Sequence, residues 1–594
     1  MEKETALDQI PERENEAEFV SRWQSEIDHA SSQEKAWKKT AKQAVKIYRA
    51  EDSDDKGTVG TNFNILYSNT QTLSAAVFNQ TPKPDVRRRY RDENDTGKEA
   101  AEVLERALLY SLDMYDFERV MKCSVHDGLL AGRGVPRIDY DPTLEEKTEL
   151  VENEEGELVN GEPYEIKTYE EVRCEPVYWE DLRIGAGRSW EEVPWVAFRH
   201  LMKRSEIKEE FGAEHSNVPL KYDVSGVKRD DTEKVTDIFK RACVWEIWDK
   251  EKREVIFIAE GYDRILSKEE DPLNLMGFFP IPKPFYAISS TASMVPVCLY
   301  STYQKLAEEL NKLTGRITSL TKAVKNVGIY DKVNTELATL LEAKDTTMIP
   351  AQNFTGLMSQ GGLQKAVEFL PVEEIARVLL NLQQAREQVK QTIFEVSGIS
   401  DIMRGQSKAS ETATAQRIKG NFGTLRVQEM QRDVQRMARD IIRMKAEVIA
   451  ENFDRDTLTL MTGKEVTSEV MEVLRSDMLR TYNIDIETDS TIAADEAEEQ
   501  ETVTKLLSAV AEYVNAMAPH VQSGLMPLPA AKELLMVAVR RFKGVRAFED
   551  TLEQAFQQGQ QLQGIGGGTA LPPADGGVVT EEQGVPVNPN GILV

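Results

Sequence analysis

The residues best placed for chemistry are three carboxylates that alternate along one short stretch. Asp485, Glu487 and Asp489 lie in TYNIDIETDST (481–491), whose alternating pattern predicts a strand with all three on one face. Carboxylate oxygens hold divalent cations, so a metal-dependent nuclease is one hypothesis. We favour a solvated strand face instead, because no glycine-bent loop gathers the acids and a nuclease would need a further carboxylate or histidine nearby.

Other catalytic constellations are missing from the sequence. The pairs Gly97-Lys98 and Gly463-Lys464 lack the upstream glycine and the following hydroxyl residue of a nucleotide-binding loop. There is no HExxH or GxSxG motif, and the five histidines are widely dispersed. We therefore expect no enzyme activity, no metal and no cofactor. Nucleotide hydrolysis in any process that uses this protein would belong to another chain.

Charge and cysteine content narrow the class of protein. The 594 residues carry a formal net charge of −28, and 29% charged with 40% hydrophobic residues is typical of a soluble globular protein. The negative charge argues against ordinary tight nucleic-acid binding, although it allows a protein that lets DNA slip past. Four scattered cysteines without a CxxC pair indicate reduced thiols in a cytosol. The N-terminus has no signal-peptide pattern, and no run of 18 apolar residues predicts a membrane span.

Two groups of arginines could contact phosphate, one after an extended segment and one along a helix. They are Arg87, Arg88, Arg89 and Arg91, and Arg432, Arg436, Arg439 and Arg443. The alternative for the first group is a solvated strand that pairs with neighbouring acids. The alternative for the second is ion pairing between helices, since Asp433 and Asp440 lie alongside. We favour the alternative in both cases.

Three long helical segments are the largest elements that the sequence predicts, and any functional residues must be positioned by them. Each carries an apolar seam with steps of three and four residues, the spacing that keeps side chains on one stripe. The seams are Leu299, Tyr303, Leu306, Leu310, Leu313, Ile317, Leu320, Val324 and Val327; Ile375, Leu379, Leu382, Val389, Ile393 and Val396, with Arg386 in register; and Val427, Met430, Val434, Met437, Ile441, Met444 and Val448. Rods of roughly 35–60 Å predict packing against copies of the same chain.

Shorter patterns predict the elements around these rods. Helices are expected over 17–50 and 97–131, and the strand that follows the second of them should stop at Asp141-Pro142. Alternation predicts hairpins within 148–178 and a strand pair over 242–260, with Trp179, Trp190 and Trp195 as core aromatics. Residues 329–370 read as a small α/β insertion, and 495–555 as helix with a break between Pro519 and Pro529. The glycine-rich and proline-rich end predicts a flexible tail.

The order of these parts resembles that of a known family, the portal proteins of tailed bacteriophages, most closely those of short-tailed phages. The resemblance covers about residues 20–495, and the C-terminal hundred residues match least. The segments that carry it are NILYSN (64–69), PKPDV (82–86), DGLLAGRGVPRIDYDP (127–142), VYWEDLRIGAGRSWEEVPWVAFR (177–199), VWEIWDK (244–250), DPLNLMGFFPIPKP (271–284), SGISDIMRGQSKASETATAQ (397–416) and IDIETDST (484–491).

The resemblance implies an α+β, mainly α fold that assembles as a ring, usually of twelve subunits, at one capsid vertex. Its parts would be a wing of helices and β-hairpins (1–293), stem helix one (294–327), a small α/β clip (328–371), stem helix two (372–403), a channel loop (404–411), a wing return helix and strand (412–494), a helical crown (495–556) and a flexible tail (557–594). A ring of this kind needs two complementary faces on every subunit.

The resemblance also implies a role and partners. The ring would be the channel for packaging and ejecting double-stranded DNA, located in the virion after assembly in the host cytoplasm. Its partners would be the terminase large subunit, the tail adaptor protein, and the major capsid and scaffolding proteins, with no membrane.

Three sets of residues follow from this placement. They are the channel loop, Arg404, Gly405, Gln406, Ser407, Lys408, Ala409 and Ser410; the channel-lining DNA contacts, Arg316, Lys322 and Lys325; and the subunit packing of the stem, Leu306, Leu310, Leu313, Ile317, Leu320 and Val324. The alternative for the basic residues is pairing with acids of the next subunit.

A cytosolic coiled-coil scaffold without nucleic acid is the alternative from a different class of protein. It explains the three rods, but it gives no reason to interrupt them with a small α/β module. The order helix, insertion, helix, loop, helix therefore favours the DNA-conducting ring.

Overall fold

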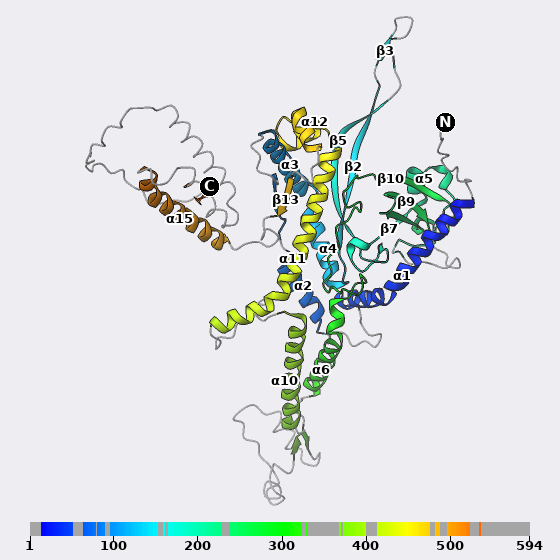
Figure 1. The fold of residues 1–594 in the computed structure, drawn as a ribbon. Coiled ribbons are helices and arrows are strands. Elements are labelled where there is room, and N and C mark those ends of the chain that lie inside the picture. Colours follow the sequence, from blue (N-terminus) through cyan, green and yellow to red (C-terminus); the bar gives the residue numbers. More distant parts are fainter. Residues whose placement is uncertain are drawn as a thin grey trace, which may run out of the picture. The chain divides into compact units, whose positions relative to one another are not determined.

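A computed structural model describes most of the chain. The described residues are 14–51, 63–78, 80–88, 95–148, 150–152, 158–160, 164–224, 226, 237–323, 328–330, 367–369, 372–399, 413–475, 482–486, 496–522, 531 and 534–535. The chain divides into two compact units, Met1–Ala493 and Ala494–Val594, which are described separately. The fold is mixed α+β and mainly helical, which confirms the predicted class (Figure 1).

The main core of the first unit joins α11 to five shorter helices. They are α11 (Ala413–Asn452), α2 (Ile65–Val77), α3 (Asp95–Met114), α4 (Phe117–Leu130), α12 (Arg455–Thr462) and α13 (Ser468–Arg475). Val434, Met437 and Ile441 on α11 are fully buried, so the seam predicted for this helix is confirmed as a buried stripe. It packs against α2, α3 and α13 of the same chain, and not against a copy.

The segment predicted as one helix over 97–131 is two helices. α3 ends at Met114 and α4 begins at Phe117, because Asp116 between them has a left-handed backbone with φ of 47°. Its carboxylate accepts a hydrogen bond from the backbone N–H of Arg119 and caps α4. Asp tolerates this conformation better than most residues, and apolar periodicity alone does not reveal it.

α1 packs on a five-stranded antiparallel sheet. The elements are α1 (Glu14–Tyr48) and, in sheet order, β10 (Ile265–Glu270), β9 (Glu254–Ala259), β8 (Ala242–Asp249), β7 (Trp195–Met202) and β6 (Leu182–Ile184). Side chains alternate along β8, so Trp245 shares a core cluster with Trp23 of α1, whereas Val244 packs with Ile207 of α5 (Arg204–Phe211). The predicted first helix and the strand pair over 242–260 are therefore confirmed.

A long two-stranded ribbon begins in the main core. It consists of β2 (Val135–Lys147) and β5 (Tyr164–Val177), and β3 (Leu150–Glu152) and β4 (Leu158–Asn160) continue it (Figure 1). The hairpins predicted within 148–178 are confirmed. β2 is buried at Val135 and Ile138, but every residue from Thr143 to Thr148 is exposed.

The strand end predicted at Asp141-Pro142 is wrong. Pro142 lies opposite Glu170 inside the ladder, and β2 continues to Lys147 after a bulge between Thr143 and Leu144. Because each ribbon strand has a single neighbour, one side of β2 needs no N–H donor, and a proline fits there.

The strand predicted around the three acids is confirmed in part. β13 (Tyr482–Ile486) pairs antiparallel with β1 (Pro84–Arg88), and Asp485 lies opposite Asp85. Glu487 and Asp489 lie outside the described residues. Within the described part of the chain, no group of three His, Cys, Asp or Glu side chains is arranged to hold a metal ion.

The second unit is described mainly through α15 (Glu496–Gln522). The helix start predicted at 495 is confirmed, but the break predicted from Pro519 begins later, because α15 continues through Pro519 to Gln522. The predicted tail lies outside the described residues. None of the helices in the described ranges combines the length and apolar composition that a bilayer crossing needs.

Candidate subunit interface and buried ionic clusters

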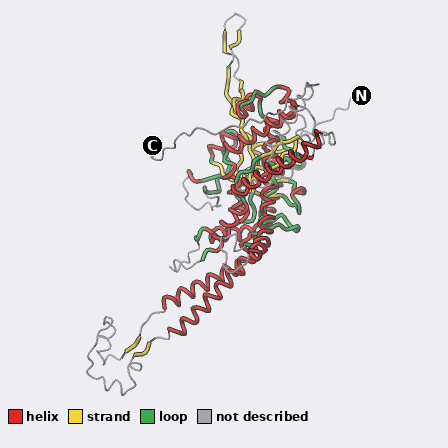
Figure 2. The backbone as a smooth tube through the Cα atoms, turned by 90° about the vertical axis from the view of Figure 1, so that its left-hand side faces the viewer, coloured by secondary structure: helices red, strands yellow, loops and turns green. Residues whose placement is uncertain are grey.

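Two helices bracket the predicted insertion. The short turn η4 (Leu299–Thr302) leads into α6 (Gln304–Ala323), and α10 (Val372–Ser397) returns beside it (Figure 2). β11 (Gly328–Tyr330) pairs antiparallel with β12 (Val367–Phe369) where the chain leaves α6 and enters α10. This ladder holds the two ends of the insertion together, and the residues between its strands lie outside the described part.

The seam predicted on α6 changes character along the helix. Leu310 is 0% exposed and belongs to the main core, whereas Leu306, Leu313, Ile317 and Leu320 remain half-buried. The packing of Leu310 is therefore satisfied within its own chain. The half-buried residues are free to contact a neighbour, and Val324 lies outside the described residues.

The seam predicted on α10 is shifted at its C-terminal end. Ile393 is buried as predicted, but Phe394 is buried in place of Val396, which is 38% exposed. The arginine in this seam, Arg386, stacks on the ring of Phe63 with its guanidinium carbon 5.2 Å from the ring centroid. The backbone N–H of Phe63 in turn donates to Oδ1 of Asn311 on α6 at 3.0 Å. Arg386 thus joins α10 to the segment before α2, a contact that periodicity does not predict.

The polar sides of the two helices carry charged and neutral side chains in different arrangements. Arg316 and Lys322 on α6, two of the predicted DNA contacts, are exposed. On α10, Gln384, Gln388 and Gln391 follow one another at steps of four and three, which places three exposed neutral side chains on one side, between exposed Arg377 and Glu395 on the same side. The predicted contact Lys325 and the predicted channel loop, residues 404–410, lie outside the described residues.

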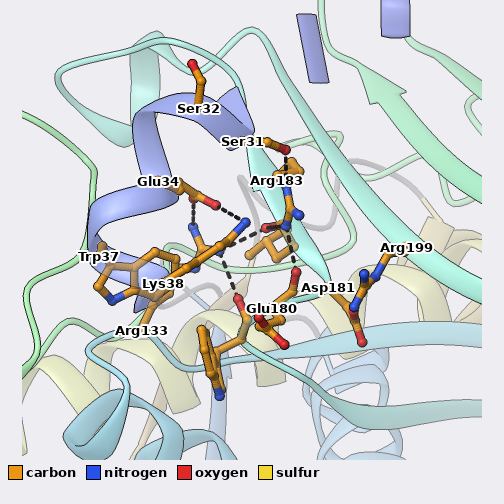
Figure 3. A network of polar contacts seen from close by, with 12 residues as sticks. Ser31, Ser32, Glu34, Trp37, Lys38, Arg133, Glu180, Asp181, Arg183 and Arg199 are labelled. Atoms are coloured by element: carbon orange, nitrogen blue, oxygen red, sulfur yellow. Dashed lines mark hydrogen bonds and ion pairs between the residues drawn. The ribbon is translucent and has the colours of Figure 1, made fainter. Parts of the chain in front are cut away.

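A buried ionic cluster fastens α1 to the body of the first unit (Figure 3). The carboxylate of Glu34 accepts from Nη1 of Arg133 at 2.6 Å and pairs with Nζ of Lys38 at 2.8 Å. Arg133 also donates to two backbone carbonyls, and its guanidinium carbon lies 4.8 Å from the centroid of Trp37. Nearby, Arg183 donates to Oγ of Ser31 at 2.8 Å.

The pKa values in this cluster show how burial and the neighbouring charges oppose each other. Burial alone would raise the pKa of Glu34, but Arg133 and Lys38 hold it below its usual range. Burial lowers the pKa of Lys38 to about 8 and that of Arg183 to about 10, although Glu34 opposes both shifts. Glu34 pairs with both Arg133 and Lys38, so its removal would leave these two cations without their carboxylate partner.

Close packing explains the two glycines on either side of Arg133. A Cβ on Gly134 would lie 1.7 Å from the carbonyl oxygen of Ser124, and Gly132 has a φ of +104°. Neither position accepts a larger residue without movement of the backbone. The two glycines in the stretch AGRGV (131–135) thus allow the side chain of Arg133 to lie in a buried site. The sequence patterns did not predict this role.

A second ionic cluster joins the ribbon to the five-stranded sheet. Arg137 of β2 binds both carboxylate oxygens of Glu246 on β8, at 2.6 and 2.7 Å. His200 of β7 and the indole N–H of Trp248 complete the site at 2.7 and 2.6 Å. Burial would raise the pKa of Glu246, but Arg137 and His200 lower it to about 2. The carboxylate therefore stays charged and stabilises this junction at neutral pH.

Lys445 is a buried cation with no carboxylate among its hydrogen-bond acceptors in the described part of the chain. Lys445 on α11 is 0% exposed and donates to Oγ of Ser111 and to the carbonyl of Val172, each at 2.8 Å. Burial lowers its pKa to about 8. Neutral acceptors replace the lost water only in part, so Lys445 costs stability while it is charged.

Arg436, one of the four arginines in the stripe predicted on α11, is engaged in local contacts. Arg436 pairs with Asp440 at 3.2 Å and with Asp433 at 3.8 Å, and it donates to the carbonyl of Lys283 at 3.1 Å. For Arg436 the favoured ion pairing with these acids is present, but it lies within one helix and not between helices. The core role predicted for Trp179 and Trp195 is confirmed, since both are buried, whereas Trp190 is only half-buried against the main core.

Comparison with known proteins adds no relative to these observations. No model of a known protein family matches the chain, and a search of curated proteins finds no match.

Proposed function

We propose that this chain is the repeating subunit of a portal ring, the channel through which double-stranded DNA enters and leaves a capsid. The observation that carries the proposal is the pair α6 and α10. The two helices bracket an insertion whose ends are joined by β11 and β12, and their shared seam is only half-covered by their own chain beyond Leu310.

The neutral middle part of one side of α10, from Gln384 to Gln391, supports a conducting role. Lys and Arg that neutralise phosphates hold DNA in a salt-dependent way, and a wall dense in cations would stall it. A wall with glutamines at 384, 388 and 391 and sparse cations such as Arg316 and Lys322 offers DNA few strong contacts. The net charge of −28 per subunit acts in the same direction.

The partners in this proposal follow from the resemblance of the sequence to portal proteins. The insertion, the proposed clip, would meet the terminase large subunit and later the tail adaptor protein. The wing would meet the capsid and scaffolding proteins. A coiled-coil scaffold is a weaker proposal, because it has no use for an insertion with joined ends.

Negative-stain microscopy of the purified full chain tests the ring directly. We expect rings with a central hole, and filaments or monomers would contradict the proposal. Ile317→Asp should prevent ring closure because it places a charge in the half-buried seam, at a cost of several kcal/mol, on the order of the burial penalty for an unpaired charge. Ser319→Asp is the matched control, since Ser319 is exposed on the same helix.

Two further changes test the channel and the clip. Deletion of 334–362 should leave the subunit soluble and abolish DNA uptake in a packaging assay in vitro. Lys408→Ala should alter packaging or DNA retention in filled heads without a change in assembly. Normal packaging by the deletion variant would remove the clip from the proposal, and nanomolar, salt-insensitive duplex binding by intact rings would contradict a low-friction channel.

A further inference from the structure

The C-terminal half of α1 carries a stripe of positive charge. Between residues 35 and 49 there are six basic residues and no acid. Five of them fall on one side of the helix by their spacing, and we call them the α1 stripe: Lys35, Lys39, Lys42, Lys46 and Arg49. All five are exposed. Such a concentration is unusual in a chain whose net charge is −28.

Only part of the stripe is neutralised within its own chain. Lys42 pairs with Glu180 at 2.5 Å, and Arg49 pairs with Glu51 at 2.9 Å. For Lys35, Lys39 and Lys46, the described residues offer no ion pair and no hydrogen bond. Three cations therefore remain available to an acidic partner.

The ribbon of β2 and β5 has the opposite charge. Within β2 and β5, residues 141–147 and 164–175 contain seven acidic residues and three basic ones. Glu145 and Glu146 are exposed and form no ion pair within the described part of the chain. The register places Glu146 opposite Glu165, and like charges in such a pair destabilise a ladder, whereas Arg173 pairs with both Asp141 and the Glu171 opposite it. A two-stranded ribbon with this pattern gains stability from an external cation.

We propose that the α1 stripe of one subunit docks on the ribbon of the next subunit. The contact rests on the proposed ring, and it identifies the two different surfaces that a head-to-tail ring needs. The lengths agree, because Lys35 to Arg49 spans about 21 Å of helix and Asp141 to Lys147 about 20 Å of strand.

A second copy of the chain fits the stripe better than DNA does. Every subunit carries both surfaces in equal number, so each contact in a closed ring is satisfied and no surface is left over. DNA would have to approach a protein that is strongly negative as a whole.

Charge reversal of each surface, in the full chain, tests the contact. The stripe variant is Lys35→Glu with Lys39→Glu and Lys46→Glu, and the ribbon variant is Glu145→Lys with Glu146→Lys and Glu152→Lys. Exposed ion pairs are individually weak, but reversal of three should weaken association about tenfold or more at 0.1 M salt. Mass photometry and circular dichroism would report assembly and folding.

Mixing the two variants gives the sharpest outcome. Each should fail to close rings alone, whereas the equimolar mixture should form rings in which the two variants alternate in equal number. A chain that carries all six changes should also recover assembly. The matched control is Lys208→Glu with Lys221→Glu and Arg264→Glu, three exposed cations associated with the other face of the sheet. It changes net charge by the same amount and should leave the rings intact.

The results separate this contact from the ring itself. Wild-type monomers would refute both the ring and the contact. Normal rings from either variant, or a folded mixture that fails to assemble, would refute the contact and leave the ring standing. If the stripe variant assembles normally but loses salt-dependent binding of a short duplex, the stripe contacts DNA and the proposed contact is wrong.

Discussion

Replacing Glu246 with Gln should show how strongly one buried carboxylate joins the ribbon to the five-stranded sheet. The pKa of Glu246 is about 2 in the fold, against an ordinary value of 4.5. That difference favours the folded state by about 3 kcal/mol at pH 7. The contribution is complete above pH 4.5 and is lost as the pH falls toward 2, because the unfolded chain takes up its proton first.

The Gln variant keeps the shape of the side chain but removes its charge. It should therefore lose about 3 kcal/mol relative to the wild type at pH 7 and only about 1 kcal/mol at pH 3. Hydrogen exchange suits a chain of this size, since it reports local opening without assuming two-state unfolding. Peptides from β2 and β8 should exchange roughly a hundredfold faster in the variant at pH 7.

Glu270→Gln is the matched control, because Glu270 is exposed on β10 of the same sheet. It should leave exchange in β2 and β8 unchanged. Equal protection of β8 in Glu246→Gln and wild type at pH 7 would refute the reasoning. A loss that does not shrink on acidification would show that the carboxylate charge is not its cause.

Two other substitutions test single features of the core. Lys445 has a pKa of about 8, against 10.5 for an ordinary lysine, so its burial penalty should fade as the pH rises. In urea unfolding, the free energy of unfolding of the wild type should therefore rise by about 2 kcal/mol relative to that of Lys445→Met between pH 8 and 10. A difference that stays constant over this range would contradict the prediction. Gly134→Ala places a methyl group 1.7 Å from the carbonyl oxygen of Ser124 and should cost at least about 2 kcal/mol; Gly315→Ala, with no atom within 4 Å of the added carbon, should be neutral or stabilising by up to about 1 kcal/mol.

Local patterns in the sequence predict much of this fold. The steps of three and four along α11 identify Val434, Met437 and Ile441 as a buried stripe, and alternation identifies the hairpins of the ribbon. These predictions succeed because each pattern is set by the geometry of a single element. Periodicity does not say which chain covers a seam, so Leu310 was expected at a subunit contact although its own chain buries it.

Backbone exceptions are harder to predict because one residue decides them. Asp116 divides α3 from α4 through a left-handed backbone, and Pro142 sits inside β2 although proline usually ends a strand. In each case the surroundings accept the exception: Asp116 caps the helix that follows it, and Pro142 lies in a ribbon with an open side. The outcome at Pro142 depends on a strand distant in sequence, whereas the cap of Asp116 forms within three residues and is hidden only by the continuous apolar periodicity.

Sequence patterns do not predict the two buried ionic clusters, because the paired residues are far apart in the chain. Glu34 meets Arg133 from 99 positions away, and Arg137 meets Glu246 from 109 positions away. A buried charge is costly unless its partner is in place, so each of these contacts constrains how α1 and the ribbon attach to the body. The α1 stripe lies on α1, which the Glu34 cluster anchors, and the acidic ribbon includes β2, which the Glu246 cluster anchors. Anchored in this way, they present opposite charges from fixed positions, and this makes a specific contact between neighbouring subunits physically reasonable.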